Sequence, residues 1–116
     1  MRDYQLYMKD ILVAIERIEV FVGNMDLEAF KADDMTTSAV IRKLEIIGEA
    51  VKGIPEEIRK SHPHVPWKEM AGMRDKLIHF YFGVDYELVW GTIKRRLPEV
   101  KLWVKEIVLS NMRSGN

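Results

Sequence analysis

Apolar side chains recur at three- and four-residue steps along most of this 116-residue sequence, and this spacing constrains the fold more than any other feature. In residues 3–22 the apolar positions are Tyr4, Tyr7, Met8, Ile11, Leu12, Ile15, Ile18 and Val22. This period is typical of a helix that buries one face against a core. No stretch alternates apolar and polar residues over the length of a strand. The sequence therefore predicts an all-α fold.

The same spacing and the breaks between periodic stretches predict the remaining helices. They are expected over residues 26–31, from the capping stretch 33–37 to about residue 52, and over residues 67–82, 86–96 and 98–109, with a short helix after Pro55. Asp3, the stretch of residues 33–37 and Asp85 stand where N-capping side chains are favoured. Only residues 61–66 form a substantial loop. We expect one antiparallel bundle of four to five main helices, with a single domain over residues 1–110 and a polar tail over residues 111–116.

Gly48 stands in the middle of the predicted second long helix, beside the apolar stripe that includes Leu44, Ile47 and Val51. A glycine inside a helix costs about 1 kcal/mol relative to alanine, so it needs a packing reason. We expect another backbone to approach closely there, which predicts a helix crossing at Gly48.

Charge and cysteine content exclude several classes of protein. The chain has 18 basic and 18 acidic residues and no cysteine. A disulfide framework and a thiolate metal site are excluded, and contact with a polyanion must be local. His62 and His64 flank Pro63 without a third metal ligand at a usual spacing, so a proline-stiffened linker is favoured over a metal site. No segment is apolar enough to span a membrane, and we expect a cytoplasmic protein.

Residues 73–81 carry the chemistry that most suggests a function. They bring an arginine, a carboxylate, an imidazole and a phenol onto barely two turns of predicted helix: Arg74, Asp75, His79 and Tyr81. Arginine offers a rigid fork of donors to phosphate oxygens, and histidine transfers protons near neutral pH. Phosphodiester chemistry without a metal is one interpretation. A half-buried histidine at a helix end, with no catalytic role, is the other.

On a regular helix Asp75 and His79 form an i, i+4 pair, in which the carboxylate orients the imidazole. Arg74 and His79 lie about 140° apart, so one helix does not bring them side by side. Either the helix is distorted near His79, or two copies of it meet across a symmetric interface. The dimer is the simpler explanation.

Two other clusters of charge accompany this motif. Arg42, Glu45, Glu49 and Lys52 form a polar strip at helical spacing on the second long helix. The strip is either a surface ladder of ion pairs or a partly buried face toward a second subunit or an active groove, with Arg42 expected to separate the two carboxylates. The basic residues Lys94, Arg95 and Arg96 either complement a helix dipole at the end of a helix or contact RNA phosphates.

Taken together, residues 72–82, residues 41–50 with their Ile-Gly-Glu-Ala sequence, and residues 89–93 resemble the HepT-like family of HEPN-domain proteins. The similarity extends over nearly the whole chain from Tyr7 onward. The motif of that family is an arginine followed by a polar residue, a histidine four to six positions on and a tyrosine two after the histidine. Arg74, Asp75, His79 and Tyr81 occupy those places.

The resemblance implies a homodimeric, metal-independent ribonuclease without a cofactor. It would act as the toxin of a type II/VII-like toxin–antitoxin pair whose partner is an MntA-type nucleotidyltransferase. His79 would transfer protons and Arg74 would stabilise charge on phosphorus, leaving 2′,3′-cyclic phosphate and 5′-hydroxyl ends. Asp75 would support the site, although its charge can weaken RNA binding. The partner would adenylylate Tyr81 and so repel RNA.

Two alternatives remain open. The first is a non-catalytic helical dimer that binds a nucleotidyltransferase or a nucleotide through the same motif. The second is a plain helical bundle whose polar strip, including Arg42, Glu45 and Glu49, closes a dimer.

Overall fold

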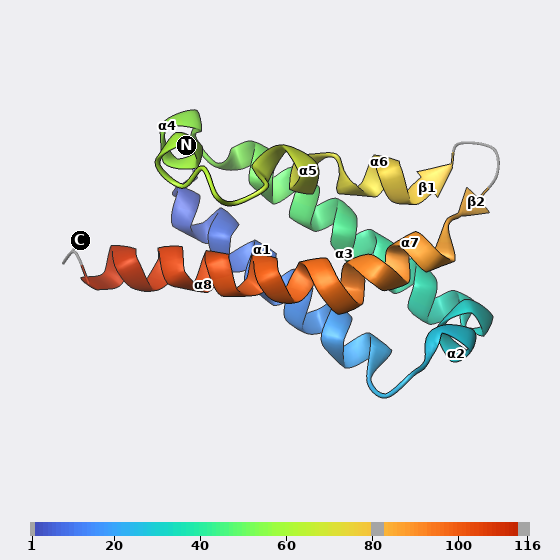
Figure 1. The fold of residues 1–116 in the computed structure, drawn as a ribbon. Coiled ribbons are helices and arrows are strands. Elements are labelled where there is room, and N and C mark those ends of the chain that lie inside the picture. The colour runs from blue at the N-terminus through green and yellow to red at the C-terminus, as the bar shows by residue number, and fades with distance from the viewer. Residues whose placement is uncertain (1, 80–82, 114–116) are drawn as a thin grey trace.

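A computed structural model describes residues 2–79 and 83–113 (Figure 1). The fold is all-α, apart from one antiparallel pairing of two residues with two. The helices are α1 (Tyr4–Val22), α2 (Leu27–Ala32), α3 (Asp34–Gly53), α4 (Glu56–Ser61), α5 (Trp67–Ala71), α6 (Met73–Leu77), α7 (Tyr86–Gly91), the π-helix η1 (Thr92–Arg96) and α8 (Leu97–Arg113). The strands are β1 (Ile78–His79) and β2 (Gly83–Val84). None of the helices in the described ranges is both long and apolar enough to cross a membrane.

The core lies between the long helices α1, α3 and α8, which cross one another in the centre of the molecule (Figure 1). The predicted apolar faces of these helices are confirmed, since most of their members are fully or almost fully buried and others, such as Tyr4, Tyr7 and Trp103, are partly buried against the core. The buried members include Met8, Ile11, Ile15, Ile18, Leu44, Ile47, Val51, Val100, Val104 and Ile107. From α2, Phe30 is completely buried and its ring centroid lies 5.3 Å from that of Trp90 in α7. Hydrophobic packing therefore joins the N-terminal helix α1 to the C-terminal helix α8.

Aspartate side chains cap the N-termini of four helices, α1, α2, α3 and α7. The sequence predicted capping before α1, α3 and α7. The side chain of Asp3 accepts a hydrogen bond from the Gln5 N–H, and Asp85 accepts one from the Leu88 N–H. Asp33, before α3, accepts one from the Thr36 N–H at 2.9 Å, and this bond lowers the pKa of the Asp33 carboxyl. Asp26 caps α2 in the same way.

The expectation of one continuous helix over residues 67–82 is wrong. Helix α5 ends at Ala71, α6 ends at Leu77, and the backbone of β1 then pairs with that of β2, His79 opposite Gly83. Gly83 has a φ of 83°, a conformation that favours glycine, and the Asp85 N–H donates to the Leu77 carbonyl at 3.1 Å. These interactions replace the hydrogen bonds that a longer helix would make.

The expectation of a break at Pro98 is also wrong. Residues 86–113 form one helical rod, in which α7, η1 and α8 follow without a loop (Figure 1). In η1 the Leu97 N–H donates to the Thr92 carbonyl, a bond one residue longer than in an α-helix. This wider turn lies directly before Pro98, which has no N–H to donate and a ring that crowds the preceding turn. The rod runs on to Arg113, past the predicted end at residue 109.

Candidate functional site

The position of Arg74 is set by the close packing of α5 and α6 on α3. Gly48 lies at this contact, and a Cβ atom placed on it would lie 3.1 Å from the carbonyl oxygen of Ala71. The helix crossing predicted at Gly48 is therefore confirmed. Any larger side chain at this position would push α5 away from α3, and Arg74, three residues after Ala71, would move with it.

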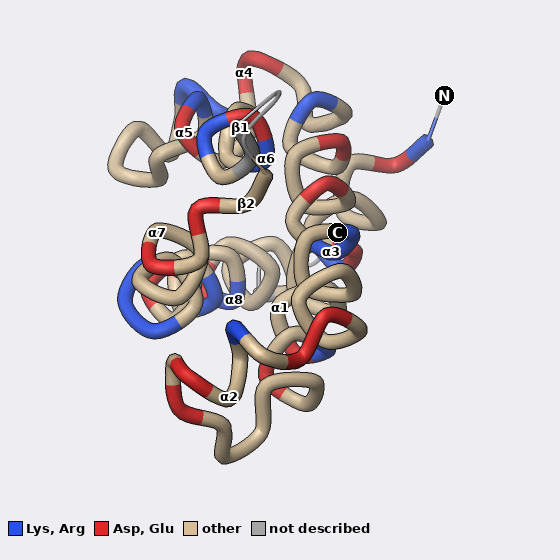
Figure 2. The backbone as a smooth tube through the Cα atoms, turned by 90° about the vertical axis from the view of Figure 1, so that its right-hand side faces the viewer, with Lys and Arg blue, Asp and Glu red and all other residues tan. Residues whose placement is uncertain are grey.

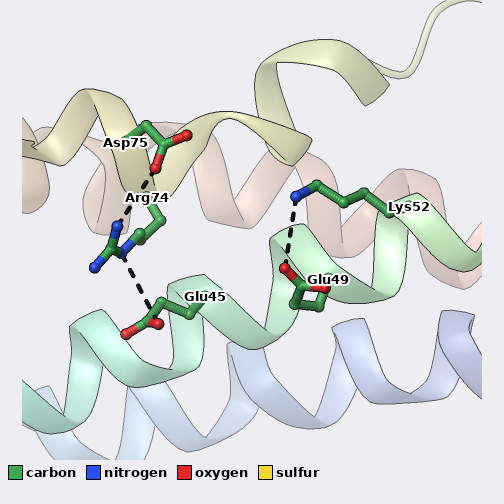
Figure 3. A network of polar contacts seen from close by, with 5 residues as sticks. All are labelled: Glu45, Glu49, Lys52, Arg74 and Asp75. Carbon is green, nitrogen blue, oxygen red and sulfur yellow. Dashed lines mark hydrogen bonds and ion pairs between the residues drawn. The ribbon is translucent and has the colours of Figure 1, made fainter.

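Two carboxylates flank the guanidinium of Arg74 (Figure 3). Its Nε lies 3.9 Å from Oε2 of Glu45 in α3, and its Nη1 lies 3.5 Å from Oδ1 of Asp75. The Arg74 side chain is 48% exposed, so solvent screens both pairs and they hold it weakly. The guanidinium is thus oriented by its neighbours and still accessible to an anion from solution.

The polar strip of α3 faces a groove that it shares with Arg74. This groove has a volume of about 460 Å³. It is lined by Arg42, Glu45, Gly48, Glu49, Lys52, Ala71, Arg74 and Asp75. Glu45 pairs across the groove with Arg74, and Glu49 pairs with Lys52 at 3.5 Å (Figure 3). The predicted role of Arg42 as the cation between Glu45 and Glu49 is wrong. Glu45 pairs with Arg74 and Glu49 pairs with Lys52 instead.

Asp75 lies in α6, whereas His79 lies in β1. Because α6 ends at Leu77, the two residues do not share a helix, and the predicted i, i+4 pair on a regular helix does not form. The helix ends before His79, as one of the two explanations considered for Arg74 and His79 requires, and the meeting of two copies across an interface stays a prediction. The side chain of His79 and all of Tyr81 lie outside the described residues, so their predicted roles stay predictions.

The three basic residues of η1 differ in their surroundings. Arg96 contacts Oε2 of Glu69 in α5 at 2.6 Å and Oε1 of Glu99 at 3.5 Å, and its hydrogen bond to Glu69 raises the pKa of Arg96. Lys94 lies 4.8 Å from the ring centroid of Trp90. The prediction that these cations stand at a helix C-terminus is wrong, because the rod continues beyond them.

The two histidines of the 61–66 loop stack rather than converge on a ligand site. The rings of His62 and His64 lie 6.2 Å apart, edge to face, and His64 packs in the same way on Trp103. Within the described ranges no three His, Asp or Glu side chains gather closely enough to hold a metal ion.

Sequence reasoning missed that Glu45 is the partner of Arg74. The signal was present, because Glu45 precedes Gly48 by nearly one turn of the same helix. A crossing at Gly48 brings whatever packs there next to Glu45. It also missed Glu69 as the partner of Arg96, for which the sequence offers no comparable signal.

Comparison with known proteins identifies a ribonuclease family model and relatives with ribonuclease names. A family model described as "Ribonuclease HepT-like" matches residues 11–107. A protein named "Putative RNase" from Methanocaldococcus jannaschii is 51% identical over 107 residues, which cover 92% of each chain. A protein named "Probable ribonuclease HepT" from Thermococcus cleftensis is 52% identical over 100 residues, which cover 86% of this chain and 91% of its own. No solved structure gives a significant match.

Proposed function

The chain belongs to the HepT-like ribonuclease family, and on this premise we propose that it is a metal-independent endoribonuclease. The observation that carries the proposal is the position of Arg74. Its half-exposed guanidinium lies at the wall of a groove, five residues before the motif histidine. A guanidinium in that position can bind a phosphodiester and stabilise charge that develops on it.

The proposed reaction is an attack by the RNA 2′-hydroxyl on the adjacent phosphorus. The new bond from the 2′ oxygen to phosphorus closes a 2′,3′-cyclic phosphate, and the bond from phosphorus to the 5′ oxygen breaks. His79 transfers one of the two protons in this step, either from the attacking hydroxyl or to the leaving oxygen, and water exchanges the other. Arg74 stabilises the negative charge on the phosphoryl oxygens. Asp75 helps to orient Arg74, which replaces its earlier role beside His79.

We further propose that the ribonuclease acts as the toxin of a two-component system. In this proposal the chain forms a homodimer, and an MntA-type nucleotidyltransferase neutralises it by adenylylating Tyr81, two residues after His79. The adenylyl group adds bulk and negative charge beside the site and repels RNA. Co-expression with such a partner should add one or more adenylyl masses to the wild type and none to Tyr81→Phe.

The deciding experiment is incubation of the purified, unmodified protein with mixed RNA in excess EDTA. Wild type should yield fragments with 2′,3′-cyclic phosphate and 5′-hydroxyl ends. His79→Ala and Arg74→Lys should lose most of the cleavage while keeping the thermal transition of the wild type, because lysine has no planar fork of donors. If wild type with unmodified Tyr81 leaves RNA intact, the proposal fails, and the non-catalytic binding dimer becomes the better explanation.

A further inference from the structure

Helix α6 presents cations on two sides. Residues two positions apart on a helix point about 200° apart, so Lys76 points away from Arg74. Arg74 faces the groove beside α3, whereas Lys76 lines a separate hollow between α6 and the rod of α7 and η1. The end of α6 therefore lies between two concave surfaces, and only one of them has so far been given a role.

The hollow at Lys76 continues along η1. It has a volume of about 80 Å³ and shares Leu88, Thr92 and Arg96 with a second hollow of about 320 Å³. The second hollow adds Gly91, Arg95 and Glu99. We call the two together the α6–η1 trench. It leads from Leu77, the residue directly before β1, along the rod to Arg95.

In this trench the Arg95 side chain lies against Gly91. A Cβ atom placed on Gly91 would lie only 2.6 Å from Nη2 of Arg95. The guanidinium therefore lies over the backbone of Gly91, and a side chain at position 91 would require it to shift. Arg95 is exposed, and among residues 2–79 and 83–113 it makes no ion pair. Arg96 beside it is already committed to Glu69 and Glu99.

The charge of the trench favours a polyanion more than the charge of the α3 groove does. The trench is lined by three cations, Lys76, Arg95 and Arg96, and by two carboxylates, both of which contact Arg96. That leaves one net positive charge, with Lys76 and Arg95 unpaired within the described part of the chain. The α3 groove has three cations and three carboxylates and is neutral. Figure 2 shows the basic stretch of η1 in blue beside α7.

We propose that the α6–η1 trench holds the backbone of single-stranded RNA that flanks the cleaved bond, with Lys76 and Arg95 as its phosphate contacts. The inference rests on the proposed ribonuclease function, because the trench begins where the motif strand begins. Leu88, which is 45% exposed and lines both hollows, offers an apolar surface for a base or ribose. Arg96 is assigned a positioning role that joins η1 to α5.

The test measures binding without cleavage. A fluorescent 12-nucleotide 2′-O-methyl RNA lacks the attacking hydroxyl, so its anisotropy reports binding to the full-length protein alone. Each phosphate contact to a single strand contributes about 0.7 to the slope of log affinity against log salt, which corresponds to about fivefold in affinity for a tenfold change in salt. Lys76→Gln and Arg95→Gln should each weaken binding severalfold at low salt and lower the slope by about 0.7.

Two further variants separate position from charge. Lys105→Gln removes an exposed cation of α8 that lines neither hollow and should bind RNA like wild type. Gly91→Ala keeps every charge and only requires the flexible end of Arg95 to shift, so it should weaken binding less than Arg95→Gln does.

Two results would overturn this inference. If Lys76→Gln and Arg95→Gln bind RNA as tightly as Lys105→Gln does, the trench is not an RNA-binding site. Such a result would not bear on cleavage activity. A 12-residue polyglutamate peptide that binds as tightly as the RNA, with the same losses in the variants, would reassign the trench to acidic proteins. Failure of wild type to cleave ordinary RNA would instead overturn the proposed function, and with it the description of the bound strand as flanking a cleaved bond, while the binding results would still report whether the trench holds RNA.

Discussion

Replacement of Gly48 by valine tests whether the spacing of α3 and α5 determines both stability and activity. A Cβ atom at this position would lie 3.1 Å from the carbonyl oxygen of Ala71 and 3.6 Å from that of Met70. Both neighbours are backbone atoms at the end of a helix, so they cannot rotate away as a side chain could. The methyl groups of valine add further atoms to a contact that is already too close.

The expected magnitude follows from two opposing effects. Valine is a better helix former than glycine by a few tenths of a kcal/mol. Overpacking of a close contact costs about 1–3 kcal/mol and outweighs that gain. With an unfolding entropy of about 2.1 cal/mol/K per residue, the 116 residues give about 240 cal/mol/K, so each kcal/mol lowers Tm by about 4 °C. After that gain is subtracted, Gly48→Val should melt about 3–11 °C below wild type.

The assay is thermal unfolding followed by circular dichroism, with Gly72→Ala as the matched control. A Cβ atom on Gly72 has its nearest contact at 3.6 Å, an ordinary distance, so this control should melt within about 2 °C of wild type. At a temperature where both are folded, Gly48→Val should also cleave RNA more slowly, because Arg74 is displaced from Glu45. An unchanged or higher Tm for Gly48→Val would refute the close approach of α5.

Three other predictions concern stability. Phe30→Ala should lower the free energy of unfolding by about 3–5 kcal/mol in urea titrations, because a fully buried ring against Trp90 is lost. The lowered pKa of Asp33 means that its contribution is present above its unfolded pKa and lost as pH falls through its folded pKa. Asp33→Asn should therefore flatten the acid side of a pH–stability curve. Glu69→Gln should cost only about 0.2–1 kcal/mol in urea titrations, because the pair with Arg96 is partly exposed.

The periodicity of apolar residues predicted the long helices because it reports which side chains are buried. It predicted the helix crossing as well, since Gly48 has no local reason to interrupt a helix. It could not predict the end of α6 at Leu77, because that end depends on hydrogen bonds from residues after Ile78, including the bond from the Asp85 N–H to the Leu77 carbonyl.

The candidate site was predictable in residue types more than in geometry. Arg74 was identified from the motif, but its neighbours depend on how α5 and α6 pack on α3. The differences among the three basic residues depend on Glu69 and Trp90, which contact Arg96 and Lys94 in the folded chain. Sequence alone treats such adjacent cations as equivalent.

The π-helical turn η1 also bears on how this chain can change in length. A π turn holds one residue more than an α turn, so it is equivalent to a single-residue insertion in an otherwise regular helix. Deletion of one residue from Thr92–Arg96 can be absorbed as an ordinary α turn, while the helix on either side keeps its orientation. Deletion elsewhere in the rod would rotate the following side chains by about 100° and expose Val100 and Val104. The turn is thus the place along residues 86–113 where deletion of one residue is best tolerated.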